Sequence, residues 1–154
     1  MNILVLHGPN LNLFGRREPH IYGSMTLAEI DRKLEMLAKE LKVELAIKQS
    51  NHEGELLDFL HGHMDRAAGA LINPGGLTQH SVSLHDAIKA MPFPCVEVHM
   101  SNIAAREGWR HHSIIAPAVH GTIQGFGWRS YAAALRLVVE LAKEKKAPAR
   151  KRAR

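Results

Sequence analysis

The segment Phe14–Gly23 reads FGRREPHIYG and places two adjacent arginines close to a tyrosine. A free phenol has a pKa near 10, so only about one in a thousand is ionised at neutral pH. A guanidinium is charged at every working pH, and it stabilises a phenolate beside it. The pairing of Arg17 with Tyr22 therefore predicts a tyrosine that acts as a general base.

The same segment contains a second arginine and is bracketed by two glycines. Arg16 could repeat the effect of Arg17, or it could simply pair with Glu18. Gly15 and Gly23 bracket the segment and are typical of the ends of a flap that closes over a substrate. Closure would expel water and strengthen the pairing between arginine and phenol.

A second candidate pair, Glu97 and His99, lies in the apolar run PCVEVHM. Residues two apart on a strand share a face, so the carboxylate can set the tautomer of the imidazole. The histidine is then a candidate general acid. Asp86, inside a predicted helix, is by itself typical of an exposed helix surface.

The segment NPGGLTQHS (73–81) supplies polar residues and a glycine pair. Gly75 and Gly76 fit either a tight turn from strand to helix or the close approach of a ligand to a helix N-terminus. No serine or cysteine lies in a nucleophile elbow, and Cys95 falls within a predicted strand. The residues therefore favour acid–base chemistry over a covalent intermediate.

No cofactor and no metal are expected. The pairs His61/His63 and His111/His112 lack a spacing that converges on one ion, and HExxH and paired CxxC motifs are absent. The segment GPNLNLFG matches neither a phosphate-binding P-loop nor a dinucleotide fingerprint.

The elements that must position these residues alternate along the chain. Short apolar runs predict five strands, at 2–7, 43–49, 69–73, 94–100 and 121–126. Apolar residues at helical spacing predict four helices, at 25–42, 53–65, 81–91 and 130–146. Thr26 and Glu29 form a capping box at the start of the first helix. This alternation predicts an α/β, flavodoxin-like doubly wound fold, with a five-stranded parallel sheet and helices on both faces.

In such sheets ligands bind beyond the carboxyl ends of the strands. The loops after the first, third and fourth strands should therefore face one another. They contain most of the candidate residues: Asn10, Arg17, Tyr22, Asn73, Gln79, Ser101, Arg106 and Arg110.

Charge is unevenly distributed along the chain. Residues 143–154 hold seven lysines and arginines and one glutamate, whereas the first 142 residues hold 13 basic and 14 acidic residues. We therefore expect a single catalytic domain at 1–142 and a basic, disordered tail at 143–154. A nucleic-acid contact would rest on the tail alone. The single cysteine and the lack of a signal peptide or membrane span favour a cytoplasmic protein.

Several segments, in order, resemble those of the type II 3-dehydroquinate dehydratases. They include LVLHGPNLNLFGRREPHIYG, INPGGLTQHSV, CVEVHMSNIAAREGWRHHS and GTIQGFG, and the likeness runs from about residue 2 to 140. The resemblance implies anti elimination of water from 3-dehydroquinate through an enolate, giving 3-dehydroshikimate. It also implies a homododecamer of four trimers, no metal, no cofactor and no Schiff base. Biosynthesis by the shikimate pathway and breakdown of quinate both remain open.

The resemblance also implies roles for single residues. Tyr22 resembles the base, Arg17 its activator, and His99 held by Glu97 the acid. Asn10 resembles the residue that holds a water against the enolate oxygen. The substrate contacts that it implies are Asn73, Asp86, Arg110, Met100 and Ser101, and Arg106 resembles a residue that steadies the loop.

One position departs from the family. Members usually carry a substrate-binding histidine where this chain has Gln79, and His80 follows one residue later. Neighbouring positions at a helix start point about 100° apart, so His80 needs a shift of the loop to reach the site. We expect Gln79 to make the contact, with His80 as the alternative.

A different class of protein would fit part of the pattern. A flavodoxin-like module that senses a small anion would use the turn at Gly75 and Gly76. It would not need Tyr22, Arg17 and His99 together.

Overall fold

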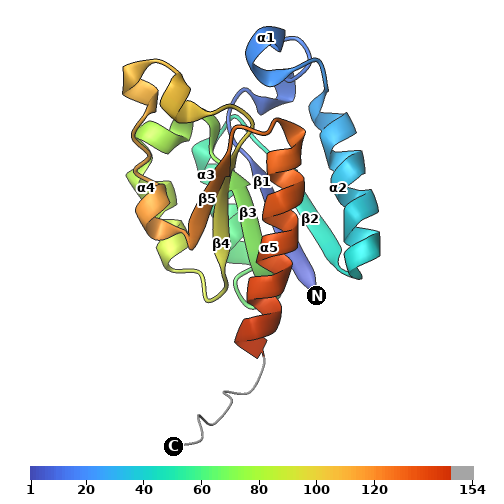
Figure 1. Ribbon diagram of the computed structural model, residues 1–154. Helices are drawn as coiled ribbons and strands as arrows, with labels where there is room; N and C mark the ends of the chain where they lie inside the picture. Colours follow the sequence, from blue (N-terminus) through green and yellow to red (C-terminus); the bar gives the residue numbers. More distant parts are fainter. Residues whose placement is uncertain (147–154) are drawn as a thin grey trace, which may run out of the picture.

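The computed structural model describes residues 1–146 and contains a five-stranded sheet in which every pairing is parallel (Figure 1). The strand order is β2-β1-β3-β4-β5, which is the flavodoxin-like order and confirms the predicted fold class. The strands are β1 (Asn2–His7), β2 (Glu44–Gln49), β3 (Ala67–Asn73), β4 (Cys95–His99) and β5 (Gly121–Gln124).

Helices cover both faces of this sheet. The two long helices α2 (Leu27–Leu41) and α5 (Trp128–Lys146) pack on one face, and α3 (Glu53–Gly62) and α4 (Val82–Lys89) pack on the other (Figure 1). Alternate residues of β1 supply both cores, because Ile3 and Val5 face α2 and α5 whereas Leu4 and Leu6 face α3 and α4.

The predicted helices and strands are all present, with ends shifted by a few residues. The capping box at the start of α2 is formed, since Thr26 Oγ1 accepts from the Glu29 backbone N–H and the Glu29 carboxylate accepts from the Thr26 N–H. A short helix that was not predicted, α1 (Pro19–Tyr22), lies inside the arginine-rich segment. Its proline occupies the first turn, where the missing N–H costs nothing.

The last helix, α5, continues to Lys146, as its apolar spacing predicted. The expectation of a disordered tail from residue 143 was therefore wrong for residues 143–146, which are helical. The helix buries Tyr131, Leu135, Val138 and Ala142. The rest of the predicted tail, residues 147–154, lies outside the described residues.

Close backbone packing brings the loops after β1 and β3 together. Gly8 N–H donates to the carbonyl of Asn73 at 2.8 Å, and a Cβ at Gly8 would lie only 2.2 Å from the carbonyl oxygen of Pro74. Glycine is therefore required for these two loops to meet.

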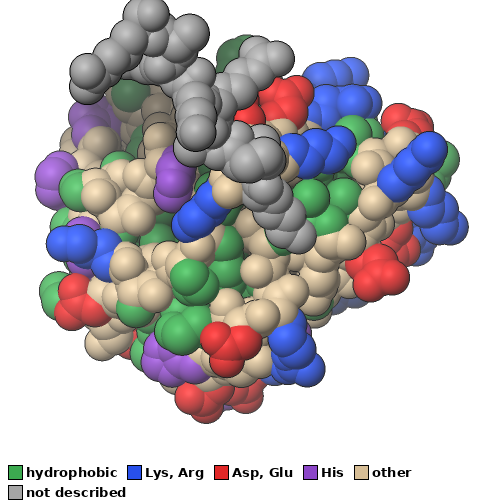
Figure 2. All heavy atoms as spheres, turned by 90° about the horizontal axis from the view of Figure 1, so that it is seen from below, with side chains coloured by type: hydrophobic (Ala, Val, Ile, Leu, Met, Phe, Trp, Pro, Cys, Tyr) green, Lys and Arg blue, Asp and Glu red, His purple; other side chains and the backbone are tan. Residues whose placement is uncertain are grey.

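The end of the molecule opposite to α1 carries basic and acidic side chains interspersed, as Figure 2 shows outside the atoms drawn in grey. This mixture agrees with the near-balance of charge in the first 142 residues. None of the helices in residues 1–146 combines the length and apolar character needed to cross a membrane.

Candidate active site

A cavity of about 190 Å³ lies over the carboxyl ends of β1, β3 and β4. Its lining includes ten of the twelve residues predicted for the site: Asn10, Arg17, Tyr22, Asn73, Gln79, His99, Met100, Ser101, Arg106 and Arg110. The three loops named from the sequence therefore meet at one place. A larger cavity of about 480 Å³ adjoins it, and the two share Tyr22, Met100, Ser101 and Arg106.

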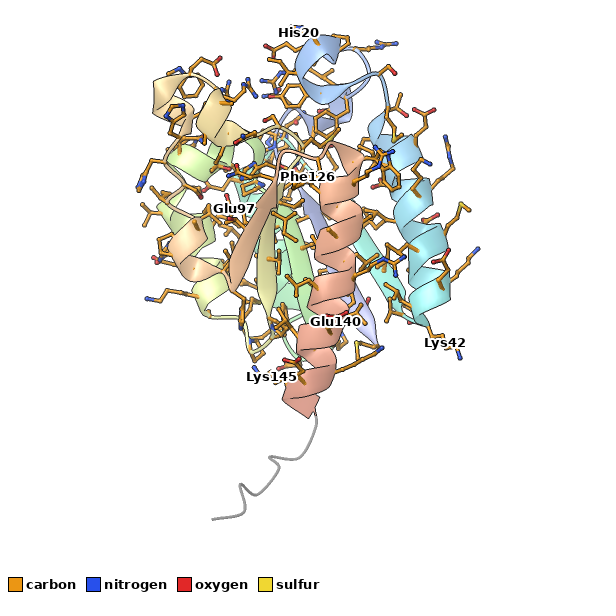
Figure 3. All side chains as sticks on the ribbon, in the orientation of Figure 1. His20, Lys42, Glu97, Phe126, Glu140 and Lys145 are labelled. Carbon is orange, nitrogen blue, oxygen red and sulfur yellow. The ribbon has the colours of Figure 1, made fainter. Side chains whose placement is uncertain are left out.

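The pair Glu97 and His99 lies on β4, as the spacing predicted. His99 Nε2 is 2.8 Å from Glu97 Oε1, and the Glu97 side chain is wholly buried within the fold (Figure 3). Ser113 Oγ lies 2.9 Å and 3.0 Å from the two carboxylate oxygens. It also accepts from the backbone N–H groups of Ile115 and Ala116, which turns its own O–H toward the carboxylate.

Ser113 was missed from the sequence because it lies 16 residues from Glu97 in an irregular loop. Burying a carboxylate requires hydrogen-bond partners for its oxygens. A glutamate in an otherwise apolar strand was thus a signal that at least one further donor had to exist.

The phenol of Tyr22 stands at the end of α1, and two positive-φ glycines flank the segment. Gly15 has φ 89° and Gly23 has φ 80°, conformations that few other residues adopt. Glu18, at the start of α1, is also left-handed with φ 39°. The backbone is thus tightly specified around Tyr22, while His20 lies on the outer side of α1 (Figure 3).

Two guanidinium groups approach Tyr22 from different loops. The Cζ atoms of Arg17 and Arg106 each lie 5.3 Å from the centre of its ring. The hydroxyl accepts a hydrogen bond from Arg106 Nη1 at 2.9 Å. Arg17 instead directs its Nε toward Glu18, at 3.3 Å. The guanidinium on the phenol oxygen therefore belongs to Arg106, which the sequence had suggested only as a support for the loop.

Arg106 is anchored over its whole length. Its side chain is 9% exposed, its Nη1 also lies 3.3 Å from Ser101 Oγ, and its Nε lies 3.3 Å from Glu107. Burial by itself would lower the pKa of Arg106, but the hydrogen bond and charge of Tyr22, together with Glu107 and Glu18, raise it. Its Nη2 is buried without a hydrogen-bond partner in residues 1–146, so the site holds an unused cationic donor.

Gln79 and the loop that contains Arg110 also line the cavity. Gln79 Nε2 donates to the carbonyl oxygen of Arg110 at 3.2 Å. The guanidinium of Arg110 lies 4.0 Å from the ring centre of Trp109 and pairs with Glu107 at 3.1 Å. Gln79 thus lines the cavity and ties two loops together, whereas His80 is exposed and does not line it.

Two further residues hold backbone positions at the cavity. Asn10 is left-handed with φ 67°, and its N–H donates to Asn51 Oδ1 at 2.9 Å. Met100 is buried, and its carbonyl accepts from Gly127 N–H at 3.0 Å.

Two predicted residues do not line the cavity. Glu97 lies behind His99 and acts on it from within the fold. Asp86 is exposed on α4, so within one chain it is not brought to the other site residues.

No group of three or more His, Cys, Asp or Glu residues suited to a metal ion occurs in the described part of the chain. His63 Nδ1 is bonded to the backbone carbonyl of Phe59, and His111 Nε2 to that of Arg106. These two side chains are therefore bonded to the backbone of nearby residues.

A family model described as "Dehydroquinase class II" matches residues 1–139. A protein from Pelotomaculum thermopropionicum named 3-dehydroquinate dehydratase is 54% identical over 142 residues, which cover 92% of this chain and 99% of that protein.

Solved structures agree with this match. The type II dehydroquinase from Propionibacterium acnes superposes with a TM-score of 0.87 at 39% identity, covering 90% of this chain and 96% of that one. The corresponding enzyme from Butyrivibrio crossotus gives a TM-score of 0.88 at 36% identity, covering 90% and 97%.

Proposed function

The chain belongs to the class II dehydroquinase family and dehydrates 3-dehydroquinate, and we propose that Tyr22 is the base and His99 the acid of this elimination. The observation that carries the proposal is the hydrogen bond from Arg106 to the Tyr22 hydroxyl, over the same cavity that His99 lines. The base comes from α1 and the acid from the end of β4, and a base and an acid from separate elements suit an elimination in which proton and hydroxyl leave from opposite faces.

In the first step, Tyr22 removes the proton beside the ketone of the substrate. A phenolate must be available for this, and a donor from a permanently charged guanidinium stabilises the ionised oxygen. Arg106 supplies that donor directly, and Arg17 adds positive charge over the ring. We therefore extend the activating role expected of Arg17 to both arginines.

The electrons of the broken C–H bond move into an enolate, whose oxygen needs a donor. We assign to Asn10 the water that meets that oxygen, because Asn10 lines the cavity and is exposed to solvent. A water-mediated hydrogen bond is enthalpically nearly as good as a direct one.

In the second step, the enolate collapses, the C–O bond breaks, and His99 gives a proton to the departing hydroxyl, which leaves as water. Nε2 is engaged by Glu97, so Nδ1 is the nitrogen that carries the proton for the leaving group. Ser113 keeps the buried carboxylate of Glu97 in place behind the imidazole.

The remaining residues bind the substrate. We assign Asn73, Gln79 and Arg110 to substrate hydroxyls and the Met100–Ser101 segment to the carboxylate. The unpaired Nη2 of Arg106 lies on the guanidinium that Ser101 contacts, so it suits the same carboxylate.

The exposed position of Asp86 on α4 fits a contact with the substrate of another copy, as in the dodecamer of four trimers that the family resemblance suggests. We further propose a cytoplasmic enzyme that serves the shikimate pathway or quinate breakdown.

The direct test is to incubate the purified protein with 3-dehydroquinate and to follow the ultraviolet absorbance of the conjugated enone product. We expect turnover after exhaustive treatment with a chelator and without added cofactor. A protein that binds the substrate but forms no enone would instead be an anion-binding module.

A further inference from the structure

Beneath the cavity, on the face covered by α2 and α5, four polar side chains form a buried chain of hydrogen bonds. His7 and Asn73 are register partners at the ends of β1 and β3, and Tyr131 of α5 bonds to both. Tyr131 Oη lies 3.0 Å from His7 Nδ1 and 2.8 Å from Asn73 Nδ2, and His7 Nε2 lies 2.9 Å from Asp31 Oδ1.

The chain is closed to solvent except at one end. His7 and Tyr131 are 0% exposed and Asn73 is 3% exposed, whereas the side chain of Asp31 on α2 is 26% exposed. A buried polar group must be paired, so each bond in the chain has a definite donor and acceptor.

The two ends of the chain fix its direction. The N–H of Gly75 can only donate, and it bonds to Asn73 Oδ1 at 3.1 Å. The carboxylate of Asp31 can only accept. Only one arrangement satisfies both ends and gives every proton in the chain a partner: Asn73 Nδ2 donates to Tyr131, Tyr131 donates to His7 Nδ1, and His7 Nε2–H donates to Asp31.

Other arrangements leave a buried group unpaired. If His7 carried a proton on Nδ1, Tyr131 Oη would accept twice and its own proton would have no partner in the described residues. Burial raises the pKa of Tyr131 far above its ordinary value, against the opposing hydrogen bond from Asn73, so the hydroxyl keeps the proton that it donates.

We propose that His7, Tyr131 and Asp31 are positioning residues that lock the amide of Asn73 in one orientation and thereby set how it binds the substrate. The lock leaves one N–H of Nδ2 and one lone pair of Oδ1 in fixed places at the cavity. Without it, only the N–H of Gly75 still holds Oδ1 of the amide, and Nδ2 loses its fixed place at the ligand. This inference rests on the proposed role of Asn73 as a substrate contact.

The first test needs no turnover. In protein labelled with ¹⁵N in its histidines, we expect the His7 ring to show a protonated, slowly exchanging Nε2 and an unprotonated Nδ1. The signals are assigned by their loss in His7→Asn. A proton on Nδ1 of His7 overturns the proposed direction of the chain, whatever the role of Asn73.

The second test is a double-mutant cycle on KM. We expect Tyr131→Phe and Asn73→Ala each to raise KM about fivefold to twentyfold with kcat within about threefold. The KM of the double variant should be no higher than that of either single variant, because both changes remove the same interaction. Additive effects in the double variant refute the coupling.

A matched control separates positioning from packing. Val139→Ala also removes volume from a buried residue of α5, but Val139 lies eight residues, about 12 Å along the helix, from Tyr131, and we expect its KM to stay within about twofold. If KM of the control variant rises as much as that of Tyr131→Phe, the effect of Tyr131→Phe is one of packing and not of positioning.

Asp31, at the exposed end of the hydrogen-bonded chain, allows a third test that needs no substitution in the core. Asp31→Ala removes the acceptor of His7, and we expect KM to rise about twofold to fivefold. Asp31→Asn keeps an oxygen acceptor and should remain near wild type. Equal behaviour of the two variants contradicts the proposal.

Discussion

The acid side and the base side of the cavity are built in different ways. His99 is 6% exposed on a central strand and bonds to Glu97, which is 0% exposed and bonded to Ser113. Tyr22 is partly exposed on a four-residue helix, and its partners Arg17 and Arg106 come from two separate loops.

The difference has a physical consequence. The geometry of the acid is fixed as soon as the sheet forms, because β4 carries both members of the pair. The geometry of the base depends on two loops that must come together, and loops are less stable locally than a sheet. Substitutions on the base side should therefore lower the rate and spare stability, whereas those on the acid side should lower both.

The largest effect is expected for Tyr22→Phe. The ring and its packing remain but the proton acceptor is lost, and a general base contributes at least about 100-fold. Turnover should fall by that much or more, while binding of the product and the melting temperature stay close to wild type. A variant that keeps more than about a tenth of the wild-type rate removes Tyr22 from the mechanism.

Arg106→Ala and Arg17→Ala should come next, with kcat lowered about tenfold to 100-fold. Loss of a positive charge makes a phenolate harder to form, so the ascending limb of the pH–rate profile should move to higher pH. The shift should be larger for Arg106→Ala, because this residue donates directly to the hydroxyl.

Lysine at either position should restore only part of the rate, since an ammonium lacks the planar fork of a guanidinium. Arg16→Ala is the matched control, and it should leave the profile in place. Profiles that do not move in either arginine variant count against the phenolate.

Glu97→Gln tests the acid side. The neutral amide cannot stabilise an imidazolium as the carboxylate does, so kcat should fall about tenfold. Stability should also fall, by about 1–3 kcal/mol, because the buried hydrogen bonds to His99 and Ser113 are disturbed. Chemical denaturation alongside kinetics separates the two effects, and unchanged stability would contradict the contrast between the two sides.

Gln79→His should have a modest effect on binding. The amide of Gln79 faces the cavity and bonds to the carbonyl of Arg110, and a neutral hydrogen bond contributes about 0.5–1.5 kcal/mol. We expect KM to change about threefold to tenfold with kcat within about threefold, and His80→Ala to be mild. A collapse of kcat in His80→Ala, with Gln79→Ala near wild type, would show that His80 serves the site.

The smallest effect on the rate is expected at the start of α2, where Thr26 lines neither cavity. Thr26→Ala removes the N-cap of α2 and should cost about 1 kcal/mol of stability. The kinetic constants should stay near wild type. A large loss of activity would mean that the start of α2, which follows Gly23 closely, also controls the position of Tyr22.

Much of the molecule was predictable because its patterns are local. Apolar periodicity identified all five strands and the four main helices, and the capping box marked the start of α2. The rule that parallel strands end together then brought the three loops to one cavity. The contact of Glu97 with His99 also follows from local geometry, since residues two apart on a strand share a face.

The tertiary structure decided which arginine reaches the hydroxyl of Tyr22. It also decided which residues hold Glu97 and the amide of Asn73. Arg106 lies 84 residues from Tyr22, Ser113 lies 16 from Glu97, and Tyr131 lies 58 from Asn73. The sequence pointed only to Glu97 as a polar residue within an apolar strand, and it gave no sign of the chain that starts at His7. The identity of the partners depends on which helix and loop pack against each strand end, and no local spacing encodes that, because hydrogen bonds are satisfied in space and not along the chain.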